Sequence, residues 1–196
     1  EDNGLILPLG QWVLQAACEQ LAVWADAAQT AGLCIAVNVS VHQFRHPEFV
    51  DMVMAAIERT GIRAHRLNLE LTESLLVEGM EVTIQKMGLL KALGVRLSLD
   101  DFGVGYSSLS CLKRLPLNQI KIDRGFVAGV LTDRHDAAIA RTVIALAQSL
   151  GLQVVAEGVE TQAQRDFLAA QGCDQFQGHL FAPALPIEAL NEFLRN

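Results

Sequence analysis

The chain has 196 residues, 51% of them hydrophobic, and a mean hydropathy of +0.29, values typical of a globular protein rather than a disordered chain. Its formal charge of −7, pI of about 5.2 and lack of any basic stripe argue against binding to a nucleic-acid polymer. No apolar run is long enough to cross a bilayer, so we expect no membrane segment in this region.

The cysteines Cys18, Cys34, Cys111 and Cys173 are widely separated and form no Cys-x-x-Cys pair. This spacing argues against a zinc-thiolate site, and a disulfide framework would be unusual at this length. We therefore expect buried thiols in a reducing cytoplasm. The chain opens on Glu1 without a signal-peptide pattern, which indicates a portion of a longer, cytoplasmic protein whose other parts could be membrane-tethered.

Strands and helices are predicted to alternate at intervals of roughly 25 to 30 residues, which is typical of βα units on a parallel sheet in one domain. Trp12 and Trp24 are expected to pack in the core, and the first strand is expected to be fully buried. The predicted strands cover residues 33–37, 66–71, 95–99, 119–123, 152–156 and 173–176. The predicted helices cover residues 10–29, 46–59, 79–93, 106–114, 136–150, 161–171 and 186–195.

Polar or charged residues stand at the carboxyl end of nearly every predicted strand. They are Asn38, Glu70, Asp100 with Asp101, Lys121 with Asp123, Glu157, and Gln177. In parallel α/β folds the carboxyl ends of the strands surround the active site, so we expect these side chains to face one centre. Taken alone, each has an ordinary alternative: Asn38 as a turn residue, Glu70 as a solvated strand end, Lys121 as a snorkelling surface lysine.

The adjacent acids Asp100 and Asp101 end a strand and precede a turn that contains Gly103 and Gly105. Neighbouring strand residues point to opposite faces, but at a strand end both carboxylates can turn towards one centre. The alternative for an isolated pair is a simple turn with a helix-capping Asp. Acids at the other strand ends favour a shared site.

Four or more carboxylates around one axis repel at neutral pH unless cations neutralise them or some stay protonated. Oxygen ligands without His or Cys indicate Mg²⁺ or Mn²⁺, with Ca²⁺ as an inhibitory competitor. Asp100 could bridge two ions while Asp101 holds the second, and two ions about 3.5–4 Å apart suit phosphodiester hydrolysis. Lys121 could orient or deprotonate the attacking water, balance developing charge, or form a plain ion pair with one acid.

Six ordered motifs across essentially the whole chain resemble the EAL domain family of cyclic-di-GMP phosphodiesterases. They are Asn38-Val39-Ser40 with Gln43-Phe44, Glu70-Leu71-Thr72-Glu73-Ser74, Asp100 to Leu109, Ile120-Lys121-Ile122-Asp123, Ala156 to Glu160, and Gln177 to Phe181. The resemblance implies an α/β fold of the (β/α)8 TIM-barrel type with one antiparallel strand. It also implies bacterial second-messenger signalling by hydrolysis of cyclic-di-GMP to linear pGpG with two Mg²⁺ or Mn²⁺ ions.

The resemblance assigns metal ligands by motif. Asn38, Glu70 and Asp100 would hold the first ion and Asp101 the second, with Glu157 also in its shell. The catalytic group would comprise Lys121, acting on the attacking water, with Glu157 and Gln177.

Further residues are assigned supporting roles by the same motifs. Glu73 would steady the loop that runs from Phe102 through Gly103 to Ser108, and Asp123 and Glu160 would support the metal ligands. Val104 stands where the family most often has Thr, which puts control of that loop in doubt more than the chemistry.

The Glu-Ala-Leu signature would precede Glu1, so residues 1–196 are expected to form a single but N-terminally incomplete domain, with about six of eight barrel strands. The missing part is expected to be disordered, displaced, cleaved, or supplied by another segment or chain. A homodimer and an upstream sensor or cyclase-like domain are implied partners. The alternatives are a cyclic-di-GMP receptor that does not cut its ligand and a scaffold that only dimerises, and the retained acids disfavour both.

Overall fold

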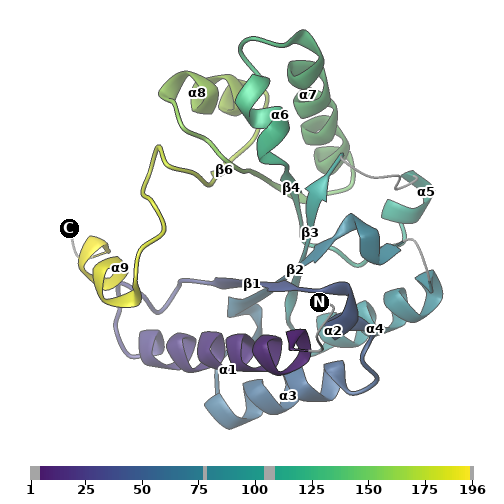
Figure 1. Ribbon diagram of the computed structural model, residues 1–196, viewed down its shortest axis with the longest axis vertical. Helices are drawn as coiled ribbons and strands as arrows, with labels where there is room; N and C mark the ends of the chain where they lie inside the picture. Colours follow the sequence, from purple (N-terminus) through teal and green to yellow (C-terminus); the bar gives the residue numbers. More distant parts are fainter. Residues whose placement is uncertain (1–4, 77–78, 104–108, 195–196) are drawn as a thin grey trace. The chain divides into compact units, whose positions relative to one another are not determined.

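The computed structural model describes residues 5–76, 79–103 and 109–194 (Figure 1). The chain divides into two compact units, residues 1–98 with 114–116 and residues 99–113 with 117–196. Strands and helices alternate in both units, as predicted, and β3 (Arg96–Phe102) begins in the first unit and ends in the second. Among the described helices, none combines the length and the apolar character needed to cross a membrane.

The first unit is built on parallel strands with helices in their connections. β1 (Ile35–Val39) pairs with β2 (Leu67–Thr72) in a register that places Asn38 opposite Glu70. α1 packs against β1 and α3, and Figure 1 shows it running alongside β1. The helices of this unit are α1 (Ile6–Ala25), α2 (Val41–Arg45), α3 (Phe49–Thr60) and α4 (Met80–Ala92), with 3-10 turns η1 (Ala64–Arg66) and η2 (Glu73–Leu76).

Strand β2 is buried on both faces, which explains its nearly continuous apolar sequence. Leu67, Leu69 and Leu71 occupy one face of the strand, while Asn68 and Glu70 occupy the other. The polar face is therefore sheltered from solvent but able to hold functional groups.

Three expectations for the first unit are wrong. The strand expected over 33–37 is not fully buried, since Cys34 and Ala36 are exposed; among the described strands β1 lies at one end of the sheet order, with β2 as its neighbour. Trp12 is 66% exposed, whereas Trp24 is buried as expected. The helix expected over 46–59 begins at Phe49, and a separate short helix, α2, precedes it.

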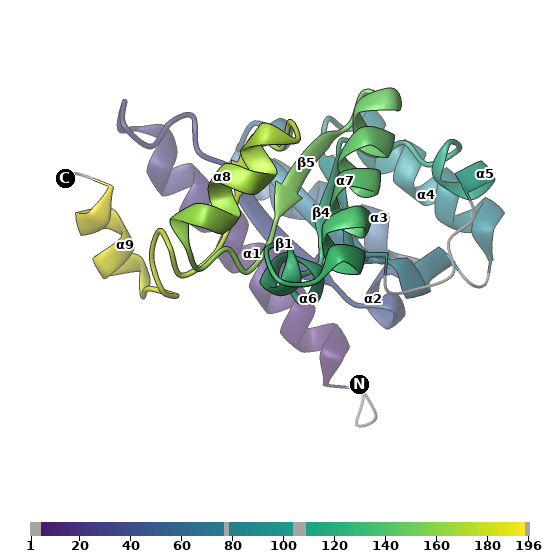
Figure 2. The same ribbon diagram turned by 90° about the horizontal axis from the view of Figure 1, so that it is seen from above.

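The second unit holds the end of β3 followed in sheet order by β4 (Gln119–Ile122), β5 (Gln153–Ala156) and β6 (Gln175–Phe176). β5 pairs in parallel with both β4 and β6. α7 packs on β4, β5 and α6, an arrangement visible in Figure 2. The helices of this unit are α5 (Leu109–Leu112), α6 (Arg124–Gly129), α7 (Arg134–Ser149), α8 (Gln162–Ala170) and α9 (Ile187–Phe193).

The six described strands match the six that were predicted, but the second unit contains an unpredicted helix. α6 begins where Asp123 caps it by accepting a hydrogen bond from the Gly125 backbone N–H at 2.8 Å.

Burial raises the pKa of the Cys18 and Cys173 thiols to about 11, and both are buried as expected. Cys34 is exposed, contrary to expectation.

Candidate metal centre

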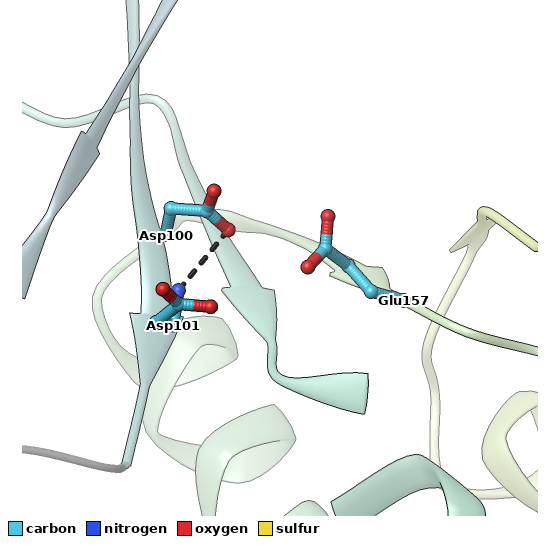
Figure 3. Close-up of side chains that lie close together, drawn as sticks. All are labelled: Asp100, Asp101 and Glu157. Atoms are coloured by element: carbon cyan, nitrogen blue, oxygen red, sulfur yellow. Dashed lines mark hydrogen bonds between the residues drawn. The ribbon is translucent and has the colours of Figure 1, made fainter. Parts of the chain in front are cut away.

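The site of the second unit starts at the end of β3, where Asp100 and Asp101 follow one another. Asp101 has φ = +52°, the only positive φ of a non-glycine residue in the described part of the chain. Asp tolerates this left-handed conformation better than most residues, and adopting it breaks the strand alternation. The Asp101 backbone N–H donates a hydrogen bond to Asp100 Oδ1 at 3.0 Å (Figure 3). The turn thus lets adjacent carboxylates share one site, as predicted.

Glu157 brings a third carboxylate to this pair. It follows β5 directly, and its backbone N–H donates to the Ile122 carbonyl oxygen at the end of β4 at 3.2 Å. One oxygen each of Asp100, Asp101 and Glu157 lie within 4.8 Å of one another. Figure 3 shows the Asp100 and Glu157 carboxylates turned towards each other.

Lys121 supplies a cation within this acidic cluster. Its Nζ lies 3.3 Å from Asp100 Oδ1 and 2.5 Å from Glu157 Oε1, and the residue is only 3% exposed. A buried ammonium is costly unless carboxylates and hydrogen bonds compensate it. The snorkelling surface lysine is therefore excluded, and ion pairing with the acids is what the structure shows.

Asp123 connects the cluster to helix α6. Its carboxylate caps that helix, and its negative charge acts on the Asp101 carboxyl. Burial raises the pKa of the Asp101 carboxyl above its usual value, and the negative charges of Asp100 and Asp123 raise it further, while Lys121 opposes them. Without metal, Asp101 therefore takes up a proton more readily than an ordinary Asp, and a bound cation would oppose this.

Glycines allow the close approach of the strand-end loops around Glu157 and Gln177. At Gly158 (φ = +67°) an added Cβ would lie 2.7 Å from the Arg124 Cβ at the start of α6. At Gly178 an added Cβ would lie 2.2 Å from the Val159 carbonyl oxygen. Larger residues at either position would therefore displace the loops that carry the functional side chains.

The other predicted residues of the second unit lie near strand ends. Gln177 is exposed, and its backbone N–H continues the β5–β6 pairing by donating to the Ala156 carbonyl at 2.8 Å. Glu160 is exposed, and its backbone N–H donates to the Gln164 side chain at the start of α8. Gly103 has φ = +102° and packs against Phe126. Their predicted functional roles stay predictions.

In the first unit, Asn38 and Glu70 are register partners on neighbouring strands. Glu70 is buried, and Glu73 is buried in the turn that follows β2. Asn68 and Ser98 exchange hydrogen bonds of 2.8 and 3.1 Å, a buried polar pair that the sequence analysis missed although both are polar residues within apolar strands. Val104 and the rest of 104–108 lie outside the described residues, so the loop role of Glu73 stays a prediction.

The donor chemistry of Asp100, Asp101 and Glu157 is that of a site for hard divalent cations. Every candidate ligand atom in the cluster is a carboxylate oxygen, and the unfavourable repulsion among them is what a cation would relieve. The cluster could therefore bind a divalent metal.

The family model described as the EAL domain matches residues 1–184 of the chain. The chain belongs to the EAL domain family.

The chain is also similar to named cyclic di-GMP phosphodiesterases. The chain is 45% identical over 190 residues to the bifunctional diguanylate cyclase/cyclic di-GMP phosphodiesterase MucR of Pseudomonas aeruginosa, covering 97% of the chain and 28% of MucR. It is 45% identical over 195 residues to the cyclic di-GMP phosphodiesterase NbdA of the same organism, covering 100% of the chain and 25% of NbdA. The chain thus spans about a quarter of the length of these relatives.

Solved EAL structures share this fold. The phosphodiesterase PaMucR, in complex with c-di-GMP, matches with a TM-score of 0.94 and 45% identity, over 97% of this chain and 76% of that one. The match confirms the predicted α/β class and the barrel-type succession of strands and helices.

Proposed function

We propose that this EAL domain hydrolyses cyclic-di-GMP to linear pGpG with the help of two Mg²⁺ or Mn²⁺ ions. The observation that carries the proposal is the convergence of Asp100, Asp101 and Glu157 around Lys121 in a chain 45% identical to two phosphodiesterases. The similarity indicates a phosphodiester substrate, and the cluster supplies the oxygen ligands that two-metal phosphodiester hydrolysis requires.

The residues present are suited to such ions. Asp101 and Glu157 would hold one, Asp100 would bridge, and Asn38 and Glu70 of the first unit would complete the set by motif. When bound, the ions would activate a water and neutralise charge on the phosphate. Ca²⁺ binds the same kind of ligands with looser geometry, so we propose that it inhibits.

The protein side chains would position the reactants. The Lys121 ammonium would hold the attacking water by a hydrogen bond or stabilise negative charge as it develops on the phosphate oxygens. Gln177, exposed beside the end of β5, would contact the substrate or water, and Asp123, at the start of α6, would support the metal ligands. Glu160 would act only indirectly.

The wider setting is also proposed from the family. We propose that residues 1–196 form one EAL domain that follows an upstream sensor or cyclase-like domain. We also propose that the protein is a homodimer in the cytoplasm. Relatives several times longer than this chain support the idea of additional domains.

The test is incubation of this chain, and of a version extended upstream, with cyclic-di-GMP and Mg²⁺ or Mn²⁺, with separation of the products by chromatography. We expect the extended version to form pGpG with either ion and to stop forming it with EDTA or Ca²⁺. Tight binding of cyclic-di-GMP without pGpG, in this chain and in the longer protein, would contradict the proposal and establish a receptor instead.

A further inference from the structure

We infer that Lys121 is the built-in counter-cation of the metal centre: without metal its ammonium holds Asp100 and Glu157 together, and a divalent cation binds only in competition with it. The inference deepens the proposed function and rests on it in one respect, that the acidic cluster takes a metal.

The geometry shows that Lys121 already does part of what a metal ion would do. Its Nζ is within ion-pair distance of both Asp100 Oδ1 (3.3 Å) and Glu157 Oε1 (2.5 Å), which come from different strand ends. The Asp100 and Glu157 side chains are only 13% and 17% exposed, so water compensates their charges poorly. The ammonium is therefore the charge that keeps these carboxylates near one another.

The backbone of Lys121 is held in strand β4, whereas its ammonium group can move. Its Cα is opposite Val155 in the parallel β4–β5 register, in the middle of a buried strand. The four-carbon side chain can rotate while the strand stays in place. Lys121 Nζ can thus leave a carboxylate without unfolding of the sheet.

Metal and lysine need the same oxygens. Asp100 and Glu157 are two of the three residues whose ligand atoms converge within 4.8 Å. A divalent cation on those carboxylates would repel the nearby ammonium. We therefore expect metal binding to weaken the ion pairs of Lys121, and metal affinity to be reduced by the free energy of that change.

The test compares Lys121→Met with wild-type protein by melting temperature in EDTA and in saturating Mn²⁺. In EDTA we expect the variant to melt roughly 5–15 °C lower, because the buried acids lose their cation. In Mn²⁺ we expect the difference in melting temperature between the two proteins to fall to about 2 °C or to change sign. Mn²⁺ titration by calorimetry should show about tenfold or more tighter binding to the variant. Lys113→Met, at an exposed lysine of the same unit, should follow the wild type in all three measurements.

Several results would overturn the inference. The first two are a melting difference between Lys121→Met and wild type that is the same in EDTA and in Mn²⁺, and equal melting temperatures of the two proteins in EDTA. The others are an Mn²⁺ affinity that the substitution leaves unchanged, and no effect of Mn²⁺ on the melting temperature of either protein. Lys121→Gln serves as a second variant, and failure of both variants to fold even with Mn²⁺ also counts against it. If the melting difference between wild type and Lys121→Met closes in Mn²⁺ as expected, but wild type does not hydrolyse cyclic-di-GMP, only the proposed function is contradicted. Hydrolysis with an unchanged melting difference would contradict this inference alone.

Discussion

At the residue scale, the cluster depends on one backbone angle. Asp101 adopts φ = +52°, which lets its carboxyl share a site with Asp100 and brings it under the influence of the Asp123 charge. The sequence predicted that both acids would face one centre, because a strand end frees them from alternation. The resemblance named Asp123 as a support for the metal ligands, but it did not reveal that Asp123 caps a helix, α6, because the periodicity does not indicate that helix.

Replacement of Asp101 by Asn should not weaken the metal-free protein. The pKa of this carboxyl is raised in the folded state, so between the ordinary and the raised value the folded protein binds more protons than the unfolded chain. The charge at Asp101 therefore lowers stability as pH rises through that window. In EDTA at pH 7, D101N should melt at the same temperature as wild type or slightly higher. The difference should vanish at about pH 3; a large loss of stability at pH 7 would contradict this account.

Gly158 should be far less tolerant of Ala than Gly151, although their φ angles are nearly equal at +67° and +69°. Nothing lies within 4 Å of a Cβ added at Gly151, so G151A should cost only the left-handed strain, about 1–2 kcal/mol. At Gly158 the Cβ meets Arg124 at 2.7 Å, so G158A should cost about 3 kcal/mol or more. Denaturant unfolding measures both, and equal costs would refute a steric role for Gly158.

At the element scale, the order of strands and helices was predictable because apolar runs and glycine stops recur along the chain. Gly61, for example, ends α3 in the left-handed conformation as expected. The start of α2 could also have been found, since Ser40 and Gln43 form a capping box. The exposure of Asn38 and Trp12 could not have been predicted. Burial depends on which elements lie beside a strand or helix, and the periodicity does not identify those neighbours.

Helix α4 holds α2 in place through one side chain that no sequence pattern indicates. Lys86 Nζ donates hydrogen bonds to the carbonyl oxygens of Phe44 (2.9 Å), Arg45 (3.1 Å) and His46 (2.7 Å), at the carboxyl end of α2. Carbonyls at the carboxyl end of a helix lack partners within it, and a cation there is favourable; the His46 carbonyl, just past α2, also accepts from the Phe49 backbone N–H at 3.1 Å. α2 follows Asn38 after only two residues, so Lys86 also stabilises the chain next to a predicted ligand.

Lys86→Met should lower the free energy of unfolding by about 1–3 kcal/mol, because three carbonyls lose a charged donor. Gln85→Met, at the exposed neighbouring position on α4, should change it by no more than about 0.5 kcal/mol. Urea unfolding of both variants makes the comparison. Equal effects of the two substitutions would show that the hydrogen bonds of Lys86 do not stabilise the fold.

At the scale of the whole molecule, the acidic cluster belongs entirely to the second unit, while Asn38, Glu70 and Glu73 belong to the first. The EAL family model matches residues 1–184 and therefore covers residues of both units. Sequence reasoning identified candidates in both units from their places at strand ends. The geometry of the second unit brings Asp100, Asp101, Glu157 and Lys121 together, and the roles of the first-unit residues stay predictions.

The most direct measurement is the initial rate of cyclic-di-GMP hydrolysis by wild type and D101N after removal of metal with EDTA and addition of Mn²⁺. The account predicts that Mn²⁺ restores the wild-type rate and leaves D101N at least about a hundredfold slower, with its fold intact. A D101N rate equal to that of wild type would contradict the metal centre at Asp100, Asp101 and Glu157. A wild type that binds cyclic-di-GMP but never cuts it would contradict the enzyme itself.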